Sequence, residues 1–137
     1  MMREIIFRAK KKEGGRWVYG NLIQSKLAAT EIMEYQAEMS AIDFEGNKQY
    51  TEFRTLHQVE EDTIGMYIGR EDCHGRRIFE GDVIYTDERG RRYVVVYDTS
   101  SMTFMAEGTH ETETMDALMC TGTVEIVGNI HDAEELK

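Results

Sequence analysis

Two carboxylates, Glu80 and Asp82, flank Gly81 at a spacing that could serve a metal ion or acid–base chemistry. At i and i+2 in a strand, both side chains would lie on one face, close enough to share a cation. The same tripeptide also fits a turn, because Gly81 permits a positive φ and Asp82 can accept backbone N–H groups. A divalent ion needs further fixed donors, and no His or Asp cluster stands nearby in the sequence. We therefore interpret Glu80, Gly81 and Asp82 as structural turn residues, and we expect no metal and no cofactor.

A second candidate for chemistry is the run Asp72-Cys73-His74-Gly75, in which a thiol stands beside a base. Neighbouring residues rarely reach the geometry of a nucleophile and its base, which must meet across a site. Turn chemistry accounts for Asp72 at the start and Gly75 at the end, and Gly69 is a further turn residue. The sequence has neither a phosphate-binding loop with Lys-Ser/Thr nor a Ser nucleophile elbow. We predict that the protein is not an enzyme.

A third candidate is a group of aromatic and cationic side chains on one expected hairpin: Tyr85, Arg89, Arg91, Arg92 and Tyr93. Small barrels can bind single-stranded nucleic acid by stacking bases on such rings. Alternate strand residues must also fill the core of a barrel, however, and that core would take some of the tyrosines. Asp87 and Glu88 offset part of the positive charge. Nucleic-acid contact by these residues is therefore the alternative interpretation, and a solvated hairpin tip is the preferred one.

The charge of the chain also bears on its partners. The net charge is −10, with 16 basic and 26 acidic residues. Residues 1–16 carry six basic and two acidic side chains, so the rest of the chain is more acidic than the whole. An acidic body repels a phosphate backbone and attracts a basic patch on a protein. The charge therefore favours a protein partner over nucleic acid.

The sequence predicts a cytoplasmic protein that does not enter a membrane. No apolar run approaches the ~20 residues that a transmembrane helix needs. The N-terminal residues include Arg3 and Lys10 to Lys12 but no apolar segment of a secretory signal. The two cysteines, Cys73 and Cys120, form no CxxC pair, and we expect them to remain thiols.

The elements before residue 63 are read from hydrophobic periodicity. Residues 4–9 and 16–23 alternate as two strands around a Gly-bearing turn, which predicts a hairpin. In residues 26–40 the apolar positions fall at i, i+4, i+7 and i+11, which favours a helix, with irregular strands as the alternative. Residues 43–47 indicate a turn, and residues 48–59 indicate a further strand.

After residue 63 the pattern becomes densely β. Short apolar runs separated by tight turns predict a small β-barrel between about residues 64 and 131. Residues 112–119 predict one or two helical turns, because Thr112 or Thr114 can cap them. We therefore expect an α+β, mostly β, fold with two regions, residues 1–62 and residues 63–137, that together form one compact unit.

Three segments carry a resemblance to a known family. They are Arg3–Ala9 (REIIFRA), Ile64–Val83 (IGMYIGREDCHGRRIFEGDV) and a final segment, 125–136, that begins EIVGNI. In these segments the sequence resembles the YopX family of phage and prophage proteins. The resemblance implies an α+β protein whose C-terminal part is an SH3-like barrel and which works inside a bacterial host cell. It brings no established activity and no catalytic residues.

The chain departs from that family pattern at two turns. Family members often have proline before a Thr-Val/Ile-Gly step, where this chain has Glu61-Asp62. They also tend to end in Asn-Pro-Glu-Leu, where this chain has Asp132-Ala133-Glu134-Glu135-Leu136. Both changes remove a rigid proline from a turn, and the expected fold stays the same.

Two classes of function follow from these observations. The first is a non-enzymatic accessory module that binds a host or phage protein and can form a homo-oligomer. The alternative is a nucleic-acid-binding barrel that uses the tyrosines and arginines named above. A metal-dependent hydrolase or nuclease built on Glu80 and Asp82 is the weaker alternative, because every catalytic pattern lacks a necessary member.

Overall fold

The computed structural model describes residues 3–132, and these residues form antiparallel strands with one short α-helix. They fold into two compact units, residues 6–64 in one and residues 3–5 with 65–132 in the other. Residues 1–2 and 133–137 are not among the described residues, so the expectations for them, including the end of the 125–136 segment, are not compared with the structure. Within residues 3–132, no helix is long and apolar enough to cross a membrane.

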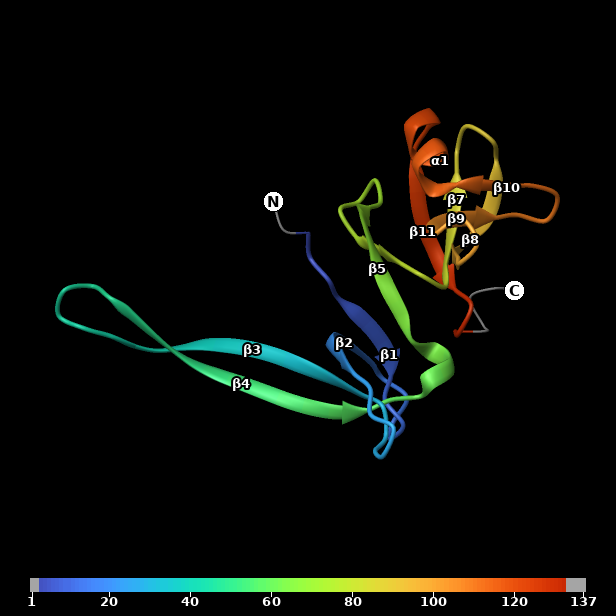
Figure 1. Ribbon diagram of the computed structural model, residues 1–137. Helices are drawn as coiled ribbons and strands as arrows, with labels where there is room; N and C mark the ends of the chain where they lie inside the picture. The colour runs from blue at the N-terminus through green and yellow to red at the C-terminus, as the bar shows by residue number, and fades with distance from the viewer. Residues whose placement is uncertain (1–2, 133–137) are drawn as a thin grey trace. The chain divides into compact units, whose positions relative to one another are not determined.

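The 6–64 unit is a sheet with strand order β4-β3-β2-β1 (Figure 1). Its elements are β1 (Phe7–Lys10), β2 (Trp17–Ile23), β3 (Glu31–Ile42), β4 (Lys48–Gln58) and the 3-10 turn η1 (Glu61–Thr63). The expected hairpin is confirmed, because β1 pairs antiparallel with β2. The small core of this unit contains four fully buried side chains: Ala9, Val18, Ile32 and Val59.

The helix expected over residues 26–40 is wrong, because Glu31–Ile42 is the strand β3. Two of the residues that suggested a helical spacing, Tyr35 and Met39, also belong to an alternating series that places them on one face with Met33. The alternating series prevails because β4 supplies a partner along nearly the whole of β3. The turn expected at residues 43–47 and the strand expected after it are both present.

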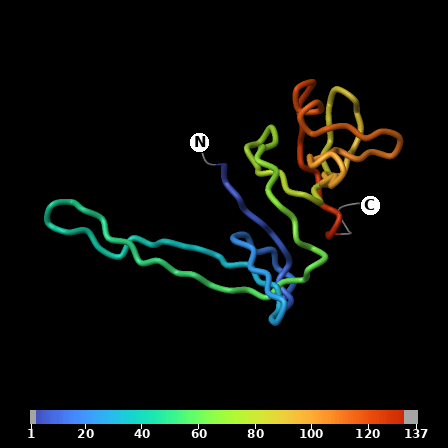
Figure 2. The backbone as a smooth tube through the Cα atoms, in the orientation of Figure 1, coloured from blue at the N-terminus to red at the C-terminus, as the bar shows by residue number. Residues whose placement is uncertain are grey.

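Strands β3 and β4 continue past β2 as a two-stranded ribbon (Figure 2). The β2–β3 pairing ends at Asn21 and Met33, so from Glu34 onward β3 pairs with β4 alone. Gly20 lies at this point with a φ of 158°, and an added Cβ would collide with the carbonyl oxygen of Met33. Glycine therefore lets the two strands approach closely where the ribbon begins.

The other unit contains a hairpin and a separate five-stranded sheet. The hairpin pairs β5 (Gly65–Glu71) with β6 (Arg77–Phe79). The sheet has the order β10-β9-β8-β7-β11. Its strands are β7 (Asp82–Thr86), β8 (Arg91–Asp98), β9 (Thr103–Glu107), β10 (Thr112–Thr114) and β11 (Val124–Asn129).

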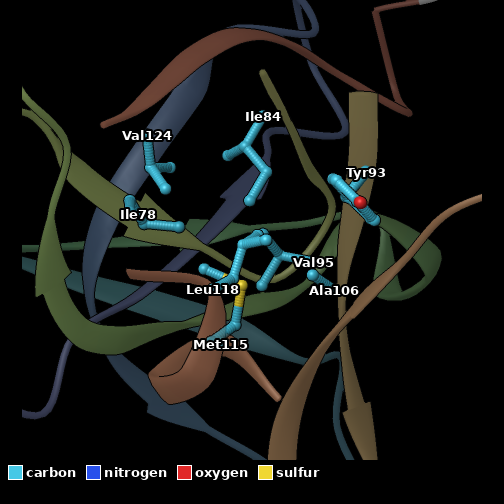
Figure 3. Packing of buried hydrophobic residues seen from close by; sticks show 8 residues of the cluster. All are labelled: Ile78, Ile84, Tyr93, Val95, Ala106, Met115, Leu118 and Val124. Carbon is cyan, nitrogen blue, oxygen red and sulfur yellow. The ribbon is translucent and has the colours of Figure 1, made fainter. Parts of the chain in front are cut away.

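The helix α1 (Met115–Thr121) lies between β10 and β11 in the chain. The hydroxyl of Thr114 accepts the N–H of Ala117 at 3.1 Å, so the helix predicted from its cap is confirmed. Met115 and Leu118 point from α1 into the core of this unit (Figure 3). The buried members of that core are Ile78, Ile84, Tyr93, Val95, Ala106, Met115, Leu118 and Val124.

The expected closed barrel is not found in the part of the chain that the structure describes. β10 and β11 are the two end strands of the five-stranded sheet and do not pair with each other. The mostly β character is confirmed, with a sheet that stays open and is covered on one face by a helix. Turn spacing predicts the number of short strands well, but closure depends on pairing between distant strands, which turn spacing does not encode.

Candidate functional site

Asp72 organises the turn between β5 and β6 as a hydrogen-bond acceptor. Its carboxylate accepts the N–H groups of His74 and Arg76 at 2.9 Å each, and that of Ile126 in β11 at 3.1 Å. Burial raises the pKa of this carboxyl, but the surrounding N–H donors lower it by more, so the pKa lies below its ordinary value of 3.8. The side chain therefore ties the turn to the edge strand of the sheet.

Glu80 and Asp82 also accept backbone hydrogen bonds. Asp82, which is 2% exposed, accepts the N–H of Phe79 at 2.8 Å, and Glu80 accepts the N–H of Met66 at 3.0 Å. Burial raises the pKa of the Glu80 carboxyl. Gly81 between them has a φ of 89°, and Gly69 and Gly75 likewise have positive φ values. This arrangement fits the turn interpretation of the three residues.

Cys73 and His74 both contact strand β11. Among residues 3–132, no three His, Cys, Asp or Glu side chains gather as metal ligands would. The backbone N–H of Cys73 donates to the carbonyl of Val124, and His74 Nε2 lies 3.4 Å from a carboxylate oxygen of Glu125. Cys73 and Cys120 are both exposed free thiols. The carboxylate beside the His74 ring thus comes from β11 and not from the neighbouring Asp72.

Four of the five predicted nucleic-acid residues, all but Arg89, line a shallow cavity of about 470 Å³. The cavity is lined by Tyr85, Arg91, Arg92 and Tyr93 together with residues of the β9–β10 turn, Gly108 to Glu111. Two of the three arginines are held by acidic side chains. Arg91 lies 2.9 Å from Glu111, and Arg89 lies 2.6 Å from Glu113.

Tyr93 is a core residue rather than a stacking platform. It is 1% exposed, and its hydroxyl donates to the carboxylate of Glu111. That hydrogen bond raises the pKa of Tyr93 and lowers the pKa of Glu111. Tyr85 and Arg92 are opposite each other on β7 and β8, so they share the other face of the sheet. Of the five predicted residues, only these two lie on that outer face.

A surface that the sequence analysis missed lies on the β3–β4 ribbon. Tyr35, Met39 and Tyr50 are 50%, 53% and 57% exposed, and the strand register places them on one face of the ribbon. Phe44 at the tip is fully exposed. An alternating apolar pattern in residues 33–39 was the signal that could have found this surface.

The comparison with known families decides where the chain belongs. The family model described as YopX protein matches residues 6–136. The chain belongs to the YopX family. The match spans the ribbon and the five-stranded sheet of this YopX protein, and the family is one of unknown function. A comparison with curated protein sequences found no match.

The face of the ribbon opposite the apolar residues carries Glu34, Glu38 and the exposed Phe53 in this YopX protein, and we call it the acidic face. Glu34 and Glu38 lie on that acidic face, across from Thr55 and Thr51 of β4. Residues 31–58 together carry six acidic and two basic side chains. His57 Nε2 lies 3.6 Å from Glu34, near the base of the ribbon.

Two of these six acidic residues, Asp43 and Glu45, lie at the tip of the ribbon. Asp43 accepts the N–H of Asn47 at 2.8 Å and that of Glu45 at 3.0 Å. These hydrogen bonds lower the pKa of Asp43, so the tip is negatively charged at neutral pH. The ribbon of this YopX protein therefore presents one apolar face, one acidic face and an acidic tip.

Proposed function

We propose that this YopX protein is a non-enzymatic protein-binding module whose acidic ribbon face and tip dock on a basic patch of a partner. The observation that carries the proposal is the exposed two-stranded ribbon with acidic residues on one face and at its tip. Complementary charge steers such an encounter and fixes its orientation. The partner belongs to the class of host or phage proteins that an accessory protein of phage origin meets in a bacterial cytoplasm.

The ribbon contributes nothing to either core, which supports a role outside the fold. The core of the 6–64 unit uses Ile32 at the start of β3 and Val59 after the end of β4. Residues 34–56 belong to neither buried cluster. A two-stranded hairpin gains little stability by itself in water. The length of the ribbon is therefore better explained by binding to a partner than by a contribution to the stability of the fold.

The other proposals draw less support from the geometry. Glu80 and Asp82 accept backbone hydrogen bonds, which gives both carboxylates a structural use in place of hydrolysis. Arg89 and Arg91 are paired with Glu113 and Glu111, so most of the positive charge on the alternative nucleic-acid surface is already neutralised. A phosphate backbone would have to compete with those carboxylates.

The test is affinity capture from lysogenic bacterial cells with variants of matched charge. Replacing Glu34→Gln and Glu38→Gln removes two charges from the acidic face, and Glu71→Gln with Glu107→Gln removes two exposed charges elsewhere. We expect a captured protein to be depleted by the first pair of changes and retained by the second. Added salt should weaken the wild-type interaction, because exposed charges are screened beyond about 8–10 Å at physiological ionic strength. Equal capture by both pairs would contradict the proposal.

A gel-shift titration against single- and double-stranded DNA and RNA at low salt separates the alternative function. We expect no saturable binding, and we expect protein capture to survive replacement of Arg89, Arg91 and Arg92. Tight binding that is lost with those three replacements would instead establish a nucleic-acid-binding protein.

A further inference from the structure

The apolar face of the ribbon is built by strand register and a β-bulge. Met33, Tyr35 and Met39 are two or four residues apart, so they share a face of β3. The register shifts between Met39 and Ala41, which returns Ile42 to the same face even though it is three residues from Met39. The full apolar face consists of Met33, Tyr35, Ala37, Met39 and Ile42 on β3 with Tyr50 and Leu56 on β4.

This apolar face is long and lies open to solvent. On β3 it runs from Met33 to Ile42, which at the rise of a strand is about 30 Å. Ile42 and Leu56 near its two ends are 57% and 53% exposed. A contiguous exposed apolar surface marks an interaction site, and a two-stranded ribbon gains little stability by itself in water.

Charge indicates which surface covers it. The apolar face carries Glu52 and Arg54 side by side, with Arg54 Nη2 3.6 Å from Glu52 Oε2, and Glu52 also accepts the hydroxyl of Tyr35 at 3.0 Å. Lys48 adds a positive charge beside Ile42, so this face is not acidic. A basic patch on a partner would therefore gain little electrostatic attraction from this face. A surface that carries one acidic side chain beside one basic side chain would be complementary to it.

We infer that a second copy of this chain covers the apolar face, through two ribbons packed face to face about a two-fold axis. A two-fold contact uses the same patch on both copies, so each residue type must find its complement within that patch. An axis through the middle of the face sets Arg54 of each copy against Glu52 of the other. The small side chain of Ala37, between Tyr35 and Met39, lets the two ribbons approach at the roughly 10 Å spacing of packed sheets.

The inference concerns a different face from the one that the proposed function uses. Packing through the apolar faces leaves Glu34 and Glu38 of both copies on the outside. The acidic faces repel each other, so the same ribbons cannot associate through them. The dimer would therefore present its acidic surface twice, and a repeated basic partner site would bind it with increased avidity.

The experiment is sedimentation of the purified full chain over a range of concentrations. Tyr50→Glu places a charge on the apolar face, and Gln49→Glu places the same charge on the opposite face at the neighbouring position of β4. Both side chains are exposed, so both variants should fold, and circular dichroism checks this. We expect a wild-type dimer, a dissociation constant raised more than about tenfold by Tyr50→Glu, and little change with Gln49→Glu.

A charge exchange provides a second, independent measurement. Glu52→Arg or Arg54→Glu alone should weaken the dimer, because each places like charges together across the axis. The double variant should recover the wild-type dissociation constant. An equimolar mixture of the two single variants should also associate as the wild type does, because there each like-charged ribbon meets opposite charges only on the other copy, whereas the ion pair within one ribbon is absent.

Several results would overturn the inference. A wild-type chain that sediments as a monomer at every concentration contradicts it, as does equal weakening by Tyr50→Glu and Gln49→Glu. If the wild-type chain is a monomer and Tyr50→Glu abolishes capture of a cell protein, then a different protein covers this face. Because capture through the acidic face is measured with Glu34→Gln and Glu38→Gln, failure of the dimer and failure of the proposed function are distinguishable.

Discussion

Buried carboxylates hold the turns of the 65–132 unit in place. Asp82 accepts the N–H of Phe79, and Asp72 accepts three backbone N–H groups, one of them from β11. Local turn chemistry predicted that both residues would be structural. It could not predict Ile126 as a partner of Asp72, because that contact joins segments far apart in the sequence.

The hydrogen bonds of Asp72 predict a pH-dependent contribution to stability. Asp72→Asn should lower the free energy of unfolding at neutral pH by about 1–3 kcal/mol, since one amide oxygen cannot replace a carboxylate that serves several donors. The folded pKa lies below 3.8, so the contribution is present above that pH and disappears as the pH falls through the folded pKa. Urea unfolding of both proteins at a series of pH values measures the difference.

The control for this prediction is Asp116→Asn, which alters an exposed ion pair with Arg70. Exposed pairs contribute little, so this change should leave stability nearly unchanged. A difference between wild type and Asp72→Asn that stays constant into acid would contradict the assignment of its role.

At the scale of elements, local signals were sufficient where neighbouring residues decide the structure. The β1–β2 hairpin, the turn at residues 43–47 and the Thr114 cap of α1 all follow from residues close to each other in the sequence. The ribbon was missed because Tyr35 and Met39 fit both a helical and an alternating pattern. Only the long partner strand β4 decides between the two patterns.

A substitution at Gly20 tests how tightly the strands pack at the base of the ribbon. Gly20→Ala should lower the melting temperature clearly, because the new methyl group would collide with the backbone carbonyl of Met33. Gly14 is a matched control, since it has a φ of 86° but no atom within 4 Å of an added Cβ. Thermal unfolding should therefore show a much larger loss for Gly20→Ala than for Gly14→Ala. Similar losses would mean that backbone strain, and not close packing, explains the glycine.

The ribbon tip should be the first site of proteolysis. Chymotrypsin should cut next to Phe44, which is fully exposed in the turn between β3 and β4. Timed digestion with mass spectrometry identifies the first fragments, and Phe44→Ala should slow their appearance. Early cleavage within residues 78–97 would contradict the structure, because those strands carry the core of the other unit.

For the whole molecule, charge predicted a class of partner but not its location. The sequence shows a net charge of −10, which favours basic protein partners. It could not show that Glu111 and Glu113 neutralise two of the three hairpin arginines, because those contacts join separate strands. It also could not show that Glu34 and Glu38 share the face opposite the apolar residues, because that depends on the β3–β4 register.

The most direct test of the account removes the ribbon and leaves the scaffold. Glu34 and Thr55 lie directly opposite each other on β3 and β4, so an Asn-Gly turn can join them in place of residues 35–54 and keep Ile32 and Val59 in the core. Capture from lysogenic cells is then compared between the shortened and full-length proteins, with thermal unfolding as the control for folding. We predict a folded protein that no longer captures the partner. A shortened protein that captures the same partner as the full-length chain would contradict the claim that the ribbon is the binding element.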